Sequence, residues 1–97
     1  MSYKESLGNV TWKFLHTFAQ GFPELLTNRQ QFLIKIFFDA LSELYPCEEC
    51  SVHFQKYLKR HPFDVTSARG IRMYLCKFHN SVNNRLNKTI VDCDKFK

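Results

Sequence analysis

Apolar residues along the first part of the chain recur at spacings of three and four, which is the period of an amphipathic helix. This pattern predicts a helix that begins near residues 4–8 and runs to about Gln20. The segment Gly21-Phe22-Pro23 then stops it. These residues give the helix one apolar face: Val10, Phe14, Leu15, Phe18 and Phe22.

A second helix is predicted by Thr27-Asn28-Arg29-Gln30, which fits a capping box. It should end at Tyr45-Pro46, because a residue that precedes proline is disfavoured in the α conformation. Its apolar face is broad, so we expect most of that face to be buried: Phe32, Leu33, Ile36, Phe37, Ala40, Leu41 and Leu44.

The second half of the chain predicts two more helices. One runs from Glu48 to about Arg60, and the other from residues 66–68 to about Leu86. The residues expected to face inward are Val52, Phe54, Tyr57 and Leu58 in the third helix and Ile71, Tyr74, Leu75, Phe78, Val82 and Leu86 in the fourth. Residues 87–97 leave room for one short extra turn. Short connections between four helices favour an all-α fold, a four-helix bundle that forms a single domain over residues 1–97.

The composition narrows the class of protein. A hydrophobic fraction of 44% and an aromatic fraction of 15% exclude a disordered chain. The net charge is +5, but the 14 Lys and Arg residues are scattered along the chain, so we expect a solvated basic surface and no nucleic-acid partner. No apolar run approaches the ~18 residues that cross a bilayer, so we expect no membrane span.

The four cysteines form a close pair, Cys47 and Cys50, and a wide pair, Cys76 and Cys93. A helix N-terminus lowers the pKa of a thiol, so the close pair can form a reversible disulfide beside a structural Cys76–Cys93 bridge. Ten helical residues after Cys76 advance the chain ~15 Å, and the next seven can return up to ~23 Å, so this bridge is feasible. A structural zinc site made by Cys47, Cys50, Cys76 and His79 fits the same spacing. The cysteine spacing alone leaves both interpretations open.

One face of the first predicted helix carries Gly8, Trp12 and His16 at intervals of four residues. Glycine permits a close approach to the backbone, and the Trp and His rings can stack on a flat ring system. The alternative is a core tryptophan beside a hydrogen-bonded histidine. The face therefore suggests a ligand without requiring one.

Asparagine is unusually frequent near the end of the fourth predicted helix, with four in residues 80–87. Asparagine is a mediocre helix former because its side chain competes with the backbone for hydrogen bonds. A row of His and Asn side chains offers donors and acceptors to a polar ligand between helices, and Arg85 and Lys88 could reach phosphates. A solvated polar face is the alternative. The row consists of Cys76, His79, Asn80, Asn83 and Asn87.

Three motifs occur together, in order, over nearly the whole chain. They are Gly8-x-x-x-Trp12-x-x-x-His16, Tyr45-Pro46-Cys47-x-x-Cys50, and His79-Asn80-x-Val82-Asn83-x-x-Leu86-x-Lys88 followed by Asp92-Cys93. This combination resembles the Erv/ALR family of FAD-linked sulfhydryl oxidases. Residues 44–54 are especially similar to the yeast endoplasmic-reticulum member.

The resemblance implies a four-helix bundle with a short fifth helix, FAD bound at the bundle mouth, and a homodimer formed through the first two helices. It implies that Cys47 exchanges with a protein thiol or an upstream oxidoreductase, that Cys50 passes electrons to the flavin, and that O₂ accepts them to give H₂O₂. Cys76 and Cys93 would form a structural disulfide, and no metal is expected. The implied contacts to FAD are Gly8, Trp12, His16, Tyr45, Cys76, His79, Asn80, Val82, Asn83, Asn87 and Lys88.

The chain departs from the family pattern in two places. Many members carry a further cysteine pair on a flexible tail, whereas this chain has no fifth cysteine. Substrates then reach Cys47 directly, or a shuttle lies on another segment, a partner subunit or another protein. The extension after Asp92-Cys93 is also shortened, and His53 is similar to only some members.

Persistent disulfides favour an oxidising compartment, the endoplasmic-reticulum lumen or the mitochondrial intermembrane space, with a viral cytoplasmic pathway as the alternative. The rival functions are a zinc-stapled helical module and a basic helical interaction protein with incidental cysteines. A thioredoxin-like fold is disfavoured, since no βαβ pattern surrounds Cys47 and Cys50.

Overall fold

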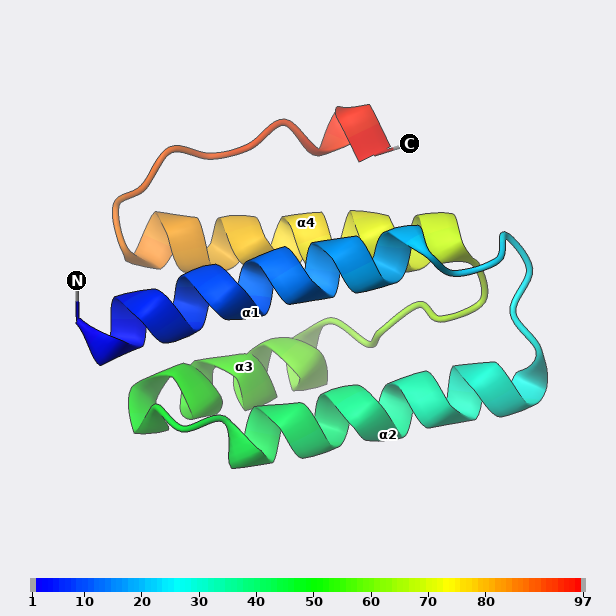
Figure 1. Cartoon of the computed structure of the whole chain (residues 1–97), viewed down its shortest axis with the longest axis horizontal. Helices are drawn as coiled ribbons and strands as arrows, with labels where there is room; N and C mark the ends of the chain where they lie inside the picture. The colour runs from blue at the N-terminus through cyan, green and yellow to red at the C-terminus, as the bar shows by residue number, and fades with distance from the viewer. Residues whose placement is uncertain (1, 97) are drawn as a thin grey trace.

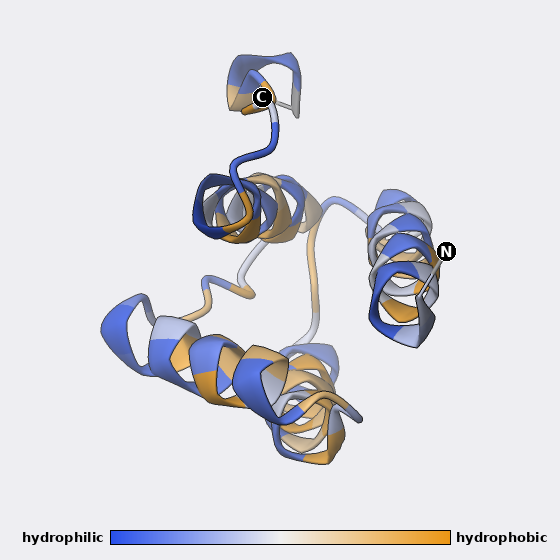
Figure 2. Cartoon of the chain, turned by 90° about the vertical axis from the view of Figure 1, so that its left-hand side faces the viewer, coloured by the Kyte–Doolittle hydropathy of each residue, from blue (hydrophilic) through white to orange (hydrophobic). Residues whose placement is uncertain are grey.

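The computed structural model describes residues 2–96 and is all-helical over that range (Figure 1). Seen along the helices in Figure 2, four helices surround a common centre, and the C-terminal tail forms an outer layer beyond the fourth. This confirms the predicted bundle with a short fifth helix. The elements are α1 (Tyr3–Gln20), α2 (Asn28–Leu44), α3 (Glu48–Arg60), α4 (Ala68–Arg85) and a 3₁₀-helix, η1 (Cys93–Phe96).

Side-chain caps mark the beginnings of α1, α2 and α4. Thr27 Oγ1 accepts a hydrogen bond from the Gln30 N–H at 3.1 Å, and the Gln30 side chain accepts one from the Thr27 N–H at 2.9 Å. The predicted capping box at the start of α2 is therefore confirmed. At the starts of α1 and α4, the Ser2 and Ser67 hydroxyls accept hydrogen bonds from the N–H groups of Glu5 and Gly70.

The end of α4 is a Schellman motif, which sequence reasoning missed. Asn87 has a φ of 57°, in the left-handed region. Its N–H donates to the Asn84 carbonyl at 3.2 Å, and the Lys88 N–H donates to the Asn83 carbonyl at 2.7 Å. Asparagine is favoured after glycine at such a position, so Asn87 has a role in ending the helix.

The core lies between the two helix pairs, α1 with α4 and α2 with α3. Phe38, Ile71 and Leu75 are among its most enclosed side chains, each with at most 2% of its surface exposed. The expected inward positions Leu15, Phe54, Ile71, Leu75 and Phe78 are confirmed as buried.

The apolar face of the first helix is largely exposed, and most of the face that was predicted to be buried in the second helix is exposed as well. Val10, Phe14 and Phe18 of α1 expose 68%, 52% and 39% of their surfaces. In α2, Ile34 and Phe38 are buried and Leu41 is half-buried. The other predicted positions are exposed: Phe32, Leu33, Ile36, Phe37, Ala40 and Leu44. Each helix carries apolar residues on more than one side. The helical period predicts that apolar residues form stripes, but it does not predict which stripe faces the core. Val52 of α3 and Leu86 after α4 are also exposed, contrary to expectation.

Two kinds of contact hold the tail against α4. Cys93 is disulfide-bonded to Cys76, with a Cα–Cα distance of 5.7 Å, which confirms the predicted bridge. Asn80 hydrogen-bonds the backbone of Val91. Across residues 2–96, no helix has the length and apolar character to cross a membrane.

Candidate active site

A cavity of about 530 Å³ lies at the end of the bundle where α1 and α3 begin and α4 ends. This volume is within the ~300–1,000 Å³ typical of sites that bind organic ligands. Eight of the predicted site residues line the cavity and are brought together from three helices, the α2–α3 loop and the segment after α4. They are Gly8, Trp12, Tyr45, Cys50, His79, Val82, Asn83 and Lys88.

The cysteine pair has two unequal positions. Cys47 is the N-cap of α3, and Cys50 lies in its first turn; the two form a disulfide with a Cα–Cα distance of 5.2 Å. Cys50 lines the cavity, whereas Cys47 lies outside the cavity wall and exposes only 6% of its surface. The partial positive charge at the N-terminus of α3 stabilises a thiolate at Cys50.

Acidic residues between the cysteines are partly neutralised. Lys4 of α1 forms an ion pair with Glu49 of α3 across the cavity mouth. The hydrogen bond from Lys4, and next its charge, lowers the pKa of Glu49. Glu49 therefore opposes a thiolate at Cys50 less than an unpaired carboxylate would.

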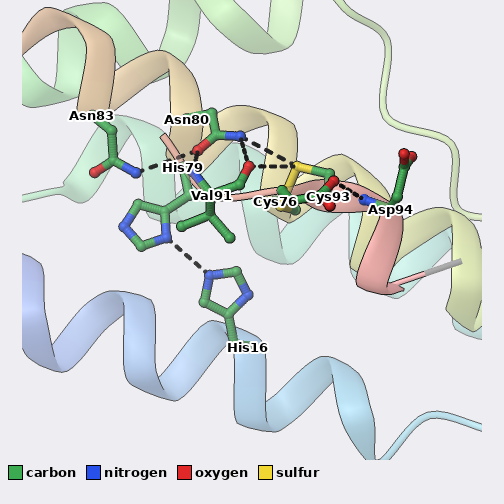
Figure 3. The surroundings of a disulfide bond; sticks show 9 residues. His16, Cys76, His79, Asn80, Asn83, Val91, Cys93 and Asp94 are labelled. Carbon is green, nitrogen blue, oxygen red and sulfur yellow. Dashed lines mark hydrogen bonds between the residues drawn. A yellow bond between two sulfur atoms is a disulfide. The ribbon is translucent and has the colours of Figure 1, made fainter. Parts of the chain in front are cut away.

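A stack of flat rings forms one wall. The Trp12 and His79 ring centroids are 4.1 Å apart, with planes 8° from parallel. His16 lies behind them, with its Nε2 3.1 Å from His79 Nδ1, as Figure 3 shows. Burial, followed by the charges of His16 and Lys88, lowers the pKa of His79 to about 4. Burial also lowers the pKa of His16, with a smaller effect from Lys95. Both imidazoles are therefore neutral at pH 7.

Tyr45 connects the loop before the cysteine pair to α1. Its hydroxyl donates to Thr11 Oγ1 at 3.0 Å, and the Thr11 hydroxyl donates to the Leu7 carbonyl at 2.7 Å. Thr11 also lines the cavity, so these hydrogen bonds connect the part of the wall that α1 forms to the part that Tyr45 forms. The predicted contact residue Tyr45 thus also has a positioning role.

The predicted row of polar residues on α4 divides into two groups. His79 and Asn83 face the cavity, and Asn83 is buried, with its amide 3.4 Å from Asn80 Oδ1. Cys76 and Asn80 instead contact the tail, and Asn87 belongs to the helix cap. These three, with His16 behind the ring stack, lie outside the cavity wall. Their predicted contacts to a ligand stay predictions.

Sequence reasoning gave little weight to two titratable residues at the site. Lys4 and His53 line the cavity, as does the predicted Arg85, and His53 Nε2 is 3.3 Å from Ser81 Oγ. His53 carried a usable signal, because it follows Cys50 by one helical turn. Lys4 carried none, since its partner Glu49 is 45 residues away.

The zinc interpretation fails on the state of its ligands. Three of its four proposed ligands, Cys47, Cys50 and Cys76, are in disulfides. The site instead combines a disulfide, a flat aromatic wall, and cationic side chains at its mouth, Lys4, Arg85 and Lys88. This set of groups fits a ligand that has both a planar ring system and phosphates.

Comparison with known proteins identifies the family. A sequence model of the Erv1/Alr family matches residues 9–97. The chain belongs to the Erv1/Alr family. It is 40% identical over 92 residues to the FAD-linked sulfhydryl oxidase ERV1 of Arabidopsis thaliana, covering 95% of this chain and 48% of that protein. It is 38% identical over 90 residues to the FAD-linked sulfhydryl oxidase ERV2 of Saccharomyces cerevisiae, covering 93% and 46%. The chain thus spans about half the length of these curated relatives.

The fold comparison agrees with this Erv1/Alr assignment. The crystal structure of the FAD binding domain of Erv1 from Saccharomyces cerevisiae superimposes with a TM-score of 0.94 at 32% identity. The match covers 99% of this chain and 91% of that domain. The family resemblance inferred from the three motifs is therefore confirmed.

Proposed function

We propose that this chain is an FAD-dependent sulfhydryl oxidase domain, which converts two thiols of a protein substrate and O₂ into a disulfide and H₂O₂. The observation that carries the proposal is the Cys47–Cys50 disulfide, of which one sulfur borders the ring-lined cavity. The relatives named FAD-linked sulfhydryl oxidases support both the activity and the cofactor.

The cavity residues fit FAD in two respects. The neutral faces of Trp12 and His79 suit a flat ring system, and the cations Arg85 and Lys88 suit its diphosphate. The buried amide of Asn83 offers a polar contact between these regions. FAD, when bound, supplies the two-electron acceptor and the route of those electrons to O₂.

The chain itself performs the thiol exchange. A substrate thiolate attacks Cys47 Sγ, the Cys47–Cys50 bond breaks, and Cys50 leaves as a thiolate. A second substrate thiolate then attacks the substrate sulfur of the mixed disulfide and releases Cys47. Two electrons have thereby moved from the substrate to the cysteine pair. Cys50 holds them at the cavity, where the N-terminus of α3 favours its thiolate.

The small exposed area of Cys47 constrains the substrate. With 6% of this residue exposed, an attacking sulfur needs a narrow approach. A cysteine on a flexible, extended segment meets this need better than one on a flat surface. We infer that the electron donor is such a segment of a protein substrate or of an upstream oxidoreductase.

The exposed apolar face of α1 and α2 supports a homodimer. Phe18 contacts Phe14 and Phe37, with ring centroids 5.4 and 5.7 Å apart, so this aromatic patch is continuous across both helices. Phe14 and Phe37 expose 52% and 36% of their surfaces. An apolar patch that extends over two helices is unusual on a monomer. We infer that a second copy of the chain covers it.

The two disulfides support residence in an oxidising compartment. The endoplasmic-reticulum lumen and the mitochondrial intermembrane space both meet this condition. A viral cytoplasmic pathway of disulfide formation is the alternative.

An absorbance spectrum and an oxygen electrode test the oxidase proposal. The purified chain, after incubation with FAD, should be yellow and should consume O₂ in the presence of dithiothreitol. Cys50→Ser should abolish O₂ consumption while flavin stays bound, because the cysteine beside the cavity is removed and the ring wall is kept. A colourless chain that cannot be loaded with FAD would refute the proposal.

A further inference from the structure

His53 has a position that the thiol exchange described above does not use. It follows Cys50 by three residues on α3, and both side chains line the same cavity. Residues three apart on a helix have Cβ atoms about 5–6 Å apart. The His53 ring is therefore within reach of the sulfur that holds the electrons of the reduced pair.

Two contacts from α4 orient the His53 ring. Its Nε2 lies 3.3 Å from Ser81 Oγ. Its plane is 28° from that of Phe78, with ring centroids 6.2 Å apart. When Nε2–H donates to the Ser81 hydroxyl, the lone pair of Nδ1 is the acceptor that remains for a proton.

Burial and nearby positive charges keep this ring neutral before the reaction. Burial, followed by the charges of Arg85 and Lys56, lowers the pKa of His53. A neutral imidazole can accept a proton at pH 7, whereas a protonated one cannot. The other titratable groups around the cavity are Lys4 and Glu5 of α1, Tyr45 after α2, Glu49 of α3, and His79 and Lys88 of α4 or its end.

We propose that His53 is a catalytic proton acceptor for Cys50, an inference that rests on the proposed oxidase function. After the pair is reduced, the S–H bond of Cys50 breaks and an N–H bond forms at His53 Nδ1. No electrons are transferred in this step, and the products are a Cys50 thiolate and a His53 imidazolium. The proton then leaves to water at the cavity mouth, and Ser81 holds the ring in place throughout.

The test measures the Cys50 thiol directly and needs no flavin turnover. In a Cys47→Ser background, Cys50 is the free thiol, and its rate of alkylation by iodoacetamide is followed against pH by mass spectrometry. With His53 present, the apparent pKa should lie below the ~8.5 of a free cysteine. His53→Gln should raise that midpoint by about one unit or more, the size expected for directly coupled groups. An unchanged midpoint in a folded His53→Gln protein overturns the proposal.

Two further variants keep the test decisive. Ser81→Ala keeps the imidazole but removes the hydroxyl that orients it, so the alkylation midpoint should move in the same direction by a smaller amount. An unchanged midpoint in Ser81→Ala overturns the proposal, even where His53→Gln fails to fold. His61→Gln is the matched control at the exposed end of α3 and should leave the midpoint unchanged. A midpoint that moves equally in His61→Gln also overturns the proposal.

A kinetic signature separates proton transfer from a loss of packing. In the FAD-loaded chain with Cys47 intact, His53→Gln should lower kcat at pH 7 by about 10²-fold, the lower range for a lost general base. Raising the pH to 9 should restore most of this loss, because the Cys50 thiolate then forms without a base. A loss that is equal at both pH values overturns the proposal. Failure of the unmutated chain to consume O₂ would refute the oxidase instead, and the alkylation profile would still report on His53 and Cys50.

Discussion

The side-chain amide of Asn80 pairs with the backbone of Val91 through two hydrogen bonds. Its nitrogen donates to the Val91 carbonyl at 2.7 Å, and its oxygen accepts from the Val91 N–H at 2.8 Å (Figure 3). The same nitrogen lies 3.3 Å from Cys93 Sγ. One side chain of α4 thus holds the tail next to the point at which the disulfide crosses.

Replacing Asn80 should loosen this attachment. Asn80→Ala leaves both backbone groups of Val91 without their protein partner, which should lower the free energy of unfolding by about 1–3 kcal/mol. Urea unfolding measures the change. Asn84→Ala, at an exposed position on the same helix, is the control and should have little effect. An equal decrease in the free energy of unfolding in both variants would show that the hydrogen bonds between Asn80 and Val91 contribute nothing specific.

Removing the Cys76–Cys93 disulfide should cost more. The cysteines are 17 residues apart, and a loop of this size corresponds to about 3 kcal/mol of stabilisation. The double change Cys76→Ala and Cys93→Ala avoids placing a hydroxyl at position 76, where 2% of the residue is exposed. The urea midpoint should fall accordingly. A midpoint equal to that of the unmutated chain would contradict a structural role for this bridge.

A charge in the aromatic patch of α1 and α2 should separate the inferred dimer. Phe14→Glu places a carboxylate where 52% of the phenylalanine is exposed, so the monomer should stay folded. In a dimer the same carboxylate would be buried without a partner, which is costly. Analytical ultracentrifugation should show a dimer for the unmutated chain and a monomer for Phe14→Glu.

The control for this experiment lies in the outer layer. Ile90 is 53% exposed in the tail, which lies beyond α4 from α1 and α2 (Figure 2). Ile90→Glu should leave the chain dimeric. A monomeric unmutated chain would refute the dimer outright.

Acid should destabilise the fold through the half-buried histidines. The pKa of His79 is about 4 in the folded chain, below the 6.5 of a free imidazole, so the unfolded chain binds more protons between these values. Its contribution to the free energy of unfolding is therefore complete above pH 6.5 and decreases as the pH falls toward 4. The lowered pKa values of His16 and His53 act in the same direction.

Urea unfolding at pH 7.5, 6 and 5 measures this dependence. His79→Gln should flatten the decrease, although His16 and His53 keep part of it. His61→Gln should show the same dependence as the unmutated chain. A His79→Gln profile parallel to that of the unmutated chain would contradict the role of this ring.

Helix limits were predictable from sequence because they depend on neighbours in the chain. The Thr27 capping box and the stop at Pro46 need only a few consecutive residues. The side of each helix that faces the core was not predictable, because it depends on distant contacts. Phe37 and Phe38 are equally apolar, yet 36% of one and 2% of the other is exposed.

The candidate site was predictable where chemistry is tied to spacing. Cys50, Trp12 and His79 meet at one cavity, as the motifs predicted. The roles of Asn80 and Asn87 could not be told apart from that of Asn83, because the sequence shows only the same residue type four times in one short stretch. To predict that Asn80 binds the tail, one must know where the chain brings Val91 back to α4. To predict that Asn87 ends the helix, one must know its backbone angle.

The first turn of α1 forms part of the rim of the cavity, through Ser2, Lys4 and Glu5. The tail ends on the opposite side of α4, in the outer layer of Figure 2. Anything fused to the start of the chain would therefore emerge beside the entrance that a ligand uses, and would crowd it. A purification tag or fluorescent reporter therefore belongs at the other end, where it does not shield the entrance.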